Sequence, residues 1–405
     1  MNNRYDAIIT GAGPAGLFCA INASAAGKRI LILEKNSEPG RKLLLSGSGQ
    51  CNFTHTGSAP EFLKHYGDSA NFVKPALSAF TNIQLIDFFE SHGIKTVTRD
   101  DGKIFPASMK ATDILSLLLK LCRENSVEIK YNSQVQSISH NGSEFILSAG
   151  SKIYAAEKLV IAAGGSSYPA TGSSGDGFRL AASLGHTITE ITTALTPLYI
   201  KDYTLGELSG ISIKESRITL IRGDRKIISG RGDILFTPKG LSGPGILDLS
   251  RYARNGDSIT ISLTDKSLQE IESVLPEALK NEGKKSIRNI LKIFEMPERV
   301  IDALLANAPV DPLKKAGEIS RAERSRIINL INASPFEIKE KGDFRTAMAT
   351  AGGVSRDEIN RKTMESKIVR DLYFAGEVID VDGDTGGYNI QWAFSSGRAA
   401  GNSLL

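Results

Sequence analysis

Apolar and polar positions follow several different patterns along the chain, and the first pattern occupies its beginning. Ala7–Ile9 is a short apolar run, Leu17–Ala26 is rich in small apolar residues, and Arg29–Leu33 is apolar again. Short apolar runs bounded by turn residues are typical of buried strands, whereas the longer run suits a helix. Gly11 to Gly16, between the first two runs, has the spacing G-x-G-x-x-G. The pattern predicts a strand, a glycine turn, a helix and a second strand.

Helical spacing dominates the next part of the chain, and strands follow it. Residues 60–125 place apolar positions three and four apart, with a small hairpin predicted around Asp101-Gly102. Segments between residues 127 and 147 alternate as strands, and Asn141-Gly142 suits the turn of a hairpin. Leu159–Ala163 is a buried strand that runs into another glycine turn.

The pattern changes again after residue 190. Short β-rich segments up to about residue 265 predict a small barrel or a sandwich, and residues 267–333 predict short helices broken by prolines. Asp371–Glu377 then reads as a strand, and a glycine turn and a helix from about Trp392 to Leu404 come after it. The end of the chain therefore resembles its beginning, and we expect the two ends to form one domain.

Composition limits the class of protein. The chain has 405 residues, of which 41% are hydrophobic and 23% are charged, values that suit a soluble protein of two or three domains. It has no apolar run long enough to span a membrane, and the first strand leaves no room for a leader. Three widely spaced cysteines indicate a reducing compartment and no zinc site, so we expect a cytoplasmic protein. A net charge of +4 permits an anionic partner without requiring one.

The first glycine turn has the features of a dinucleotide site. Gly11 allows the tight turn, Gly13 lets a pyrophosphate approach the backbone, and Gly16 lets the helix pack closely on the sheet. The helix N-terminus presents N–H groups to phosphate oxygens. Glu34 ends the second strand, where a carboxylate can bind a ribose. A merely tight turn would not need Glu34, and no later glycine turn has the same spacing, so we predict one tightly bound dinucleotide.

A second glycine-rich segment, Gly40–Asn52, follows directly. Its glycines and serines offer backbone N–H groups, and Arg41 and Lys42 add positive charge, which suits a diphosphate. A flexible polar loop is the alternative. Cys51 lies in this segment, and it is either a buried apolar side chain, the commoner role of a free cysteine, or a catalytic thiol.

A basic face is predicted in the helical part of the chain. Lys284, Arg288 and Lys292 recur at every fourth position and would share one side of an amphipathic helix. A solvated helix face is one interpretation, and contact with RNA phosphates is the other.

Acidic residues near the end of the chain raise the question of a metal. Asp380, Asp382 and Asp384 alternate ahead of Gly386-Gly387. A calcium loop of the EF-hand type needs a later glutamate, and residues 384–390 contain none, so no metal site is predicted.

Taken together, these motifs closely resemble a known family over essentially the whole chain. The segments that carry the resemblance are Gly11 to Gly16, Gly40 to Asn52, Ala162 to Pro169, Lys239 to Pro244, Thr363 to Lys367 and Gly376 to Gly397. The sequence resembles a bacterial family of FAD flavoproteins of the BaiN/RdsA (YhiN-like) type, labelled aminoacetone oxidase family or NAD(P)/FAD-dependent oxidoreductase. One position departs from the family pattern, because Gln50 stands where the family usually has arginine.

The resemblance implies an α/β fold with a Rossmann FAD-binding domain of glutathione-reductase type, into which a small β-barrel domain and a helical domain are inserted. We place the FAD-binding domain at residues 1–190 and 345–405, the barrel at 191–265 and 335–344, and the helical domain at 266–334.

The resemblance also implies the cofactor, FAD, and its contacts. The glycine turn would hold the pyrophosphate, Glu34 the adenosine ribose and Glu377 the ribityl chain, while the helix after Gly387 would face the pyrimidine edge of the flavin. The predicted cofactor-binding residues are Gly11, Ala12, Gly13, Pro14, Ala15, Gly16, Glu34, Lys35, Arg41, Lys42, Ser46, Gly47, Gly49, Gln50, Cys51, Asn52, Val135, Ala163, Gly164, Gly376, Glu377, Gly387, Tyr388, Asn389 and Ile390.

Three activities are associated with the family: reduction of uridine in large-subunit ribosomal RNA, reduction of bile-acid enones, and amine oxidation. The first two add hydride to a C=C bond conjugated to a carbonyl, and a thiol such as Cys51 could then supply the proton. The basic face favours uridine in 23S ribosomal RNA, so we predict a dihydrouridine synthase. A small-molecule enone reductase, an amine oxidase and a flavin redox sensor without turnover are the alternatives. NAD(P)H is a candidate transient reductant.

Overall fold

Parallel strands from distant parts of the chain form the centre of the first unit. The computed structural model describes residues 3–24 and 27–404. In it β1 (Arg4–Thr10) lies between β2 (Ile30–Leu33) and β9 (Lys152–Ile161), and all three are parallel. β6 (Glu128–Lys130) continues the sheet beside β2, and β18 (Leu372–Phe374) pairs in parallel with the end of β9. A strand from the C-terminal part of the chain therefore completes a sheet begun at its start.

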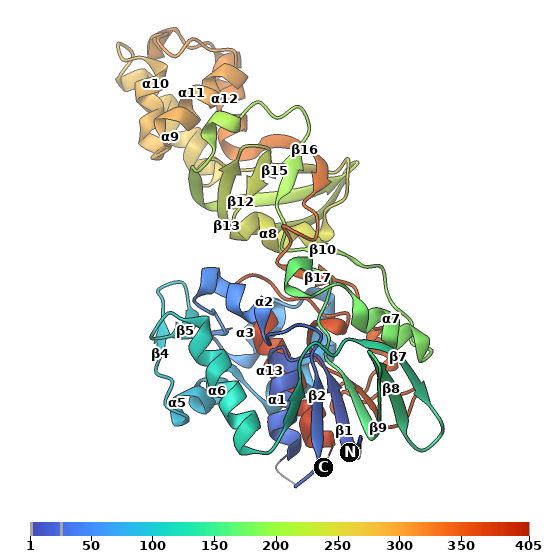
Figure 1. Cartoon of the computed structure of the whole chain (residues 1–405). Coiled ribbons are helices and arrows are strands. Elements are labelled where there is room, and N and C mark those ends of the chain that lie inside the picture. The colour runs from blue at the N-terminus through green and yellow to red at the C-terminus, as the bar shows by residue number, and fades with distance from the viewer. Residues whose placement is uncertain (1–2, 25–26, 405) are drawn as a thin grey trace. The chain divides into compact units, whose positions relative to one another are not determined.

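An antiparallel hairpin and three helices complete this layer. β7 (Val135–His140) and β8 (Phe145–Ala149) join the start of β9 and bring the sheet to seven strands. α1 (Pro14–Ala23) packs against α6 (Ala111–Glu124) and α13 (Tyr388–Ser403). Figure 1 shows the blue start and the red end of the chain side by side here.

Small residues explain how closely α1 and α13 approach each other. A Cβ on Gly397 would lie 2.5 Å from the carbonyl oxygen of Ala15, and a Cβ on Gly401 would lie 2.5 Å from that of Cys19. Both distances are shorter than a real Cβ contact allows, so these positions of α13 need glycine.

Shorter elements surround the sheet. The other helices of this unit are α2 (Arg41–Leu45), α3 (Ala59–Lys64), α4 (Ala70–Ala79), α5 (Asn82–Ser91) and α7 (Asp176–Ser183). Its other strands are β3 (Thr54–His55), β4 (Thr96–Thr98), β5 (Lys103–Pro106), β10 (Thr192–Ala194) and β17 (Ala349–Ala351). β3, β5 and β4 form a small sheet that contains the predicted hairpin, and β10 pairs with β17.

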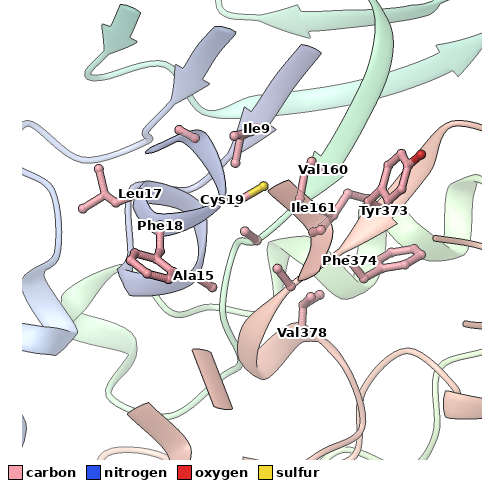
Figure 2. Packing of buried hydrophobic residues seen from close by; sticks show 14 of the residues in the cluster. Ile9, Ala15, Leu17, Phe18, Cys19, Val160, Ile161, Tyr373, Phe374 and Val378 are labelled. Atoms are coloured by element: carbon pink, nitrogen blue, oxygen red, sulfur yellow. The ribbon is translucent and has the colours of Figure 1, made fainter. Parts of the chain in front are cut away.

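The apolar core joins both ends of the chain. Figure 2 shows Ile9 of β1, Phe18 of α1, Val160 of β9 and Phe374 of β18 in one cluster, and all four are buried. The short apolar runs of the sequence supply these side chains. Their burial through the hydrophobic effect stabilises this arrangement of strands and helices.

The second unit begins with a closed barrel. Its six strands follow the order β11 (Leu198–Ile200), β14 (Gly240–Ser242), β13 (Arg225–Thr237), β12 (Ser212–Arg222), β15 (Ser258–Ile261) and β16 (Ser334–Lys341). β16 pairs back to β11 and closes the barrel. Of the two predicted alternatives, barrel and sandwich, the barrel is therefore the one observed.

Helices fill the chain between β15 and β16. They are α9 (Leu268–Asn281), α10 (Ile287–Ile290), α11 (Glu298–Asn307) and α12 (Arg321–Ala333), and α8 (Pro244–Leu249) lies within the barrel segment. Apolar side chains of the barrel and of these helices belong to one buried cluster.

The predicted fold class is confirmed, with some shifted boundaries. α1 starts at Pro14 and not at Leu17, as suits proline in the first turn, and the predicted residues 25–26 lie outside the described residues. α13 starts at Tyr388, four residues before the predicted Trp392. The chain divides into residues 1–194 with 347–405, and residues 195–346. The finer separation of barrel and helical domains stays a prediction. No helix within the described ranges is both long and apolar enough to cross a membrane.

Candidate functional site

The turn between β1 and α1 has room for a ligand at one glycine and none at two others. A Cβ on Gly11 would lie 2.6 Å from the carbonyl oxygen of Ala162, and a Cβ on Gly16 would lie 2.0 Å from that of Gly11. Gly11 also has φ +99°, which favours glycine. At Gly13 a Cβ would meet no atom within 4 Å. Tight packing behind the turn and open space in front of Gly13 fit a pyrophosphate at the N-terminus of α1.

Glu34 holds this turn in place from the end of β2. Its side chain is buried, Oε2 accepts a hydrogen bond from the Ala12 N–H at 2.8 Å, and Oε1 accepts one from the Asn36 N–H at 2.8 Å. A carboxylate oxygen can accept more than one hydrogen bond, so both oxygens keep acceptor capacity for ribose hydroxyls. The geometry fits the predicted ribose contact.

Four further predicted residues belong to the same unit. Lys35 Nζ donates to Asp176 Oδ2 at 2.7 Å and to Ser174 Oγ at 2.6 Å. Ala163 follows β9, and its Cα is 3.1 Å from where a Cβ of Gly11 would lie. Gly164 has φ +75°, and Val135 is buried at the start of β7. Their contacts with a cofactor stay predictions.

Four separate segments meet at Glu377. Its Oε2 accepts a hydrogen bond from Lys42 Nζ at 2.6 Å across 335 residues of sequence. Its Oε1 accepts one from the Thr350 N–H at 2.9 Å and one from Ser167 Oγ at 3.0 Å. Burial alone would raise the pKa of the Glu377 carboxyl, but the Lys42 ammonium and these hydrogen bonds lower it on balance. Glu377 is therefore an oriented carboxylate. Sequence reasoning missed Ser167 and Thr350, because only the folded chain brings them here.

The loop after α2 has an unusual backbone. Gly47, Ser48, Gly49 and Cys51 have φ values of +56°, +57°, +86° and +61°. Residues other than glycine rarely adopt this left-handed backbone conformation, because it costs free energy. Proteins usually keep such a conformation where function needs a fixed loop. Asn52 secures the end of the loop by donating to the carbonyl oxygens of Thr54 and Ile104.

The remaining predicted residues of this segment bond mainly to protein. Arg41 Nη1 donates to Asn36 Oδ1 at 3.4 Å, and Ser46 Oγ donates to the carbonyl oxygen of Leu43 at 2.6 Å. Gln50 Oε1 accepts a hydrogen bond from Arg99, whose guanidinium lies over the ring of Phe105. Arg99 therefore supplies a guanidinium next to the position at which the resembled family has one.

Cys51 lies inside the protein. Its side chain has no exposed surface, and burial raises the pKa of the thiol to about 12, against a smaller lowering by a hydrogen bond with Ser46. A fully enclosed thiol does not face an open cofactor site in this conformation, and the catalytic role of Cys51 stays a prediction.

The start of α13 forms the other side of the candidate site. Gly387 has φ +97° and caps the helix, and a Cβ there would lie 2.7 Å from the carbonyl oxygen of Thr54. Asn389 exchanges two hydrogen bonds of 2.8 Å with the backbone of Gly383, which fixes the glycine turn. Ile390 is half-buried, and Gly376 donates its N–H to Ser396 Oγ. An oriented helix N-terminus of this kind suits partial negative charge on a ligand.

Two histidine rings flank the side chain of Tyr388. The rings of His65 and Tyr388 are stacked with centroids 4.1 Å apart, and those of His55 and Tyr388 are stacked at 5.4 Å. His65 Nδ1 lies 3.0 Å from Asp384 Oδ2, and the Asp384 N–H donates to the carbonyl oxygen of His65. The carboxylate fixes Nδ1 as a donor, and within the described residues no hydrogen bond to protein occupies Nε2. The sequence analysis missed the pair of His65 and Asp384, because nothing in the local sequence pattern marks His65.

The predicted basic helix is wrong. α9 ends at Asn281, so Lys284 lies in the connection before α10, while Arg288 lies in α10 and Lys292 in the 3₁₀ turn Leu291–Phe294 that continues it. Ser286 breaks the helix by pairing with Lys315. Arg288 bonds to Asp302 and Glu298, and Lys292 Nζ bonds to Glu298. Two of the three predicted cations are therefore neutralised by α11.

Comparisons with known proteins identify the family of the chain. The model of the family described as "HI0933-like protein Rossmann domain" matches residues 5–403. The chain is 34% identical to "Ribosomal RNA dihydrouridine synthase" of Escherichia coli (strain K12), over 99% of this chain and 98% of that protein. It is 28% identical to "3-dehydro-bile acid delta(4,6)-reductase" of Clostridium scindens, over 98% of each. A 3-ketosteroid delta1-dehydrogenase from Sterolibacterium denitrificans has a similar fold, with 12% identity, coverage of 100% and 99%, and a TM-score of 0.53.

These findings confirm the predicted resemblance and the predicted class of enzyme, a flavin-dependent oxidoreductase, and they support a flavin as its cofactor. The family model covers almost the whole chain, and the E. coli relative is similar over its full length. This chain belongs to the HI0933-like Rossmann-domain family.

Proposed function

We propose that this chain binds FAD and reduces the C5=C6 bond of a uridine in 23S ribosomal RNA. The observation that carries the proposal is the full-length similarity, at 34% identity, to a ribosomal RNA dihydrouridine synthase. The open space at Gly13, the buried carboxylate of Glu34 and the oriented carboxylate of Glu377 support this proposal, because they suit different parts of a long dinucleotide such as FAD.

Bound FAD, once reduced, supplies hydride to an electron-poor carbon. The protein then has to orient the uracil ring, exclude water and deliver a proton to C5. We assign the proton delivery to His65, because its Nδ1 is fixed by Asp384 and its ring lies at the start of α13. His65 remains partly exposed, so it can regain a proton from solvent. Cys51 is the alternative proton donor, but its thiol is enclosed.

The reductant and the place of action follow from the same proposal. The later glycine turns of the chain lack the spacing G-x-G-x-x-G, so NAD(P)H would bind only transiently. A ribosomal RNA substrate places the enzyme in the cytoplasm.

The proposal is tested on ribosomal RNA from cells that lack the gene for this chain. Mass spectrometry of 23S nucleosides should show that one dihydrouridine is lost, and a plasmid copy of the gene should restore it. A plasmid copy with Gly13→Val is the matched control and should not restore it. An unchanged dihydrouridine content in the deletion strain would overturn the proposed substrate.

Reduction of a small enone is the second candidate function, favoured by the similarity to the bile-acid reductase. Purified protein with reduced flavin should be offered deproteinised ribosomal RNA and a steroid 4-en-3-one in parallel. We expect oxidation of the flavin by RNA; oxidation by the steroid alone would replace RNA with a small-molecule substrate.

A further inference from the structure

Two arginines face each other on the outside of the barrel. Arg217 on β12 is directly opposite Arg231 on β13 in the antiparallel register. Ser216, Ile218 and Leu220 point into the barrel and are buried, so the alternation of the strand directs Arg217 outward. Like charges directly opposite each other destabilise a sheet, and this pair therefore has a cost that packing does not explain.

Both guanidinium groups bond to the same uncharged atom. Arg217 Nη1 and Arg231 Nη2 donate to the carbonyl oxygen of Asp265 at 3.1 and 2.8 Å, and Arg217 Nη2 donates to Asn332 Oδ1 at 3.1 Å. Each guanidinium has five N–H donors, so most of the donors of the pair are not used by these contacts. The shared carbonyl brings the two positive groups together without neutralising either.

Carboxylates near the pair are engaged elsewhere. Across the described residues, neither Arg217 nor Arg231 forms an ion pair with a carboxylate. The nearby Glu270 carboxylate accepts hydrogen bonds from the backbone and hydroxyl of Ser267, where it caps α9. Burial and the charge of Arg231 lower the pKa of Arg217, and the more distant carboxylates of Asp265 and Glu270 offset this effect only in part.

Two other arginines of the same unit are neutralised. Arg222, at the end of β12, contacts both carboxylate oxygens of Asp257 at 2.8 Å, and Arg288 bonds to Asp302 and Glu298. Hydroxyl groups continue the outward row beside the unpaired arginines, because Thr219 and Ser229 are also opposite each other and 2.9 Å apart. This outward row of the barrel therefore holds two guanidinium groups that, among the described residues, form no direct ion pair.

We propose that the Arg217–Arg231 pair, with Thr219 and Ser229 beside it, binds phosphate groups of the RNA backbone. The inference rests on the proposed function, and it places RNA binding on the barrel in place of the predicted Lys284, Arg288 and Lys292. Planar guanidinium groups bind phosphate oxygens through paired N–H donors, and hydroxyls add neutral hydrogen bonds. RNA supplies the missing negative charge.

The experiment compares two double variants of the full-length flavin-loaded protein. R217Q/R231Q removes two charges while each glutamine keeps an N–H donor for the Asp265 carbonyl. R225Q/K226Q removes two charges from the exposed start of β13 and is the matched control. R217K/R231K keeps both charges and guards against a folding defect. The probe is a labelled, uridine-containing RNA hairpin, titrated at several salt concentrations.

We expect R217Q/R231Q to bind the hairpin about 10- to 100-fold more weakly and to lower the slope of log K against log salt by about 1.4 to 1.8, the value for two lost phosphate contacts. The control and R217K/R231K should stay within about threefold of wild type, and flavin content should be unchanged in all variants. An unchanged slope in R217Q/R231Q, or an equal loss in the control, would overturn the inference.

Activity separates this inference from the proposed function. If wild-type protein forms dihydrouridine in ribosomal RNA and R217Q/R231Q does so equally well at limiting RNA, the surface is wrong and the function stands. If wild-type protein reduces only a small enone and forms no dihydrouridine, the proposed function falls, and the RNA surface falls with it.

Discussion

The two units of the chain place their charges in opposite ways. In the Rossmann unit, the charged side chains around the candidate site have partners, as in Lys42 with Glu377 and Lys35 with Asp176. On the barrel, Arg217 and Arg231 face each other, and among the described residues neither forms a direct ion pair with a carboxylate. A half-buried charge needs a partner, whereas a surface for a polyanion works only if its charge is unpaired. This contrast fits our two proposals, in which fixed geometry holds the cofactor and cations without direct ion pairs bind the RNA backbone.

The largest effects should come from substitutions at two glycines of the Rossmann unit. Gly13 lies beside open space, and Gly16 packs against the backbone. Gly13→Val adds atoms where the structure has none within 4 Å, so the protein should fold but lose nearly all its flavin. Gly16→Ala places a Cβ 2.0 Å from the backbone oxygen of Gly11, and it should lower the stability of the fold by about 1–3 kcal/mol. Flavin absorbance per folded protein and chemical denaturation measure the two effects.

The contrast between the two substitutions is the test. Full flavin content in a Gly13→Val protein would mean that the pyrophosphate does not bind at this turn. A Gly16→Ala protein with unchanged stability would mean that the turn is looser than the structure has it.

The next largest effect concerns proton delivery. His65→Gln should leave flavin content and its reduction by an artificial donor intact, while single-turnover reduction of RNA falls by about 10²–10⁴-fold, the usual contribution of a positioned acid. Asp384→Asn should act through His65 and change the pH profile of the same step, because Asp384 fixes Nδ1. Cys51→Ala is the comparison variant, and its turnover per folded molecule should stay within about threefold. Loss of the step in Cys51→Ala with normal turnover in His65→Gln would transfer the acid role to the thiol.

The sequence was sufficient where short-range patterns decide the structure. The G-x-G-x-x-G spacing with Glu34 predicts the first strand, turn and helix, because each glycine has a local reason to be there. For the β-rich segments after residue 190, the sequence left two architectures, a barrel and a sandwich. The alternation of apolar and polar residues marks strands but does not show how a sheet closes. The meeting of Lys42, Ser167, Thr350 and Glu377 could not be predicted, because it depends on the packing of four distant segments.

One error has a physical cause that the sequence hides. The spacing of Lys284, Arg288 and Lys292 suggested one helix, but α9 ends at Asn281 and the backbone of Ser286 pairs with Lys315. Burial of the single side chain of Cys51 within a glycine-rich loop likewise has no signature in the sequence, which therefore left two roles open for this residue.

Burial of a histidine within the Rossmann unit also predicts a pH effect on stability. His186 is buried, its Nδ1 lies 3.0 Å from Glu358 Oε2, and its Nε2 lies 2.8 Å from Ser366 Oγ. Burial lowers the pKa of His186 and outweighs the raising effect of Glu358. Below the ordinary histidine pKa of about 6.5, the unfolded chain therefore binds a proton that the folded chain resists.

Stability should accordingly fall as pH is lowered from about 7 to about 5, and His186→Gln should flatten this dependence. Denaturation curves at several pH values measure it, with His92→Gln, a change at an exposed histidine, as the control. A wild-type curve that is flat over this range would contradict the buried neutral imidazole.

The smallest effect should come from the cations that the sequence first suggested for RNA. Arg288 and Lys292 are held by Glu298 and Asp302, so their charge is largely cancelled before any RNA arrives. R288Q/K292Q should therefore change RNA affinity by less than about threefold, since exposed paired charges contribute little. E298Q/D302N should release both cations and strengthen RNA binding slightly, with a steeper salt dependence. The same hairpin titration used for Arg217 and Arg231 measures both variants. A loss of RNA affinity in R288Q/K292Q as large as that in R217Q/R231Q would show that ion pairing does not decide which cations bind RNA. The contrast between paired and unpaired charges would then be wrong.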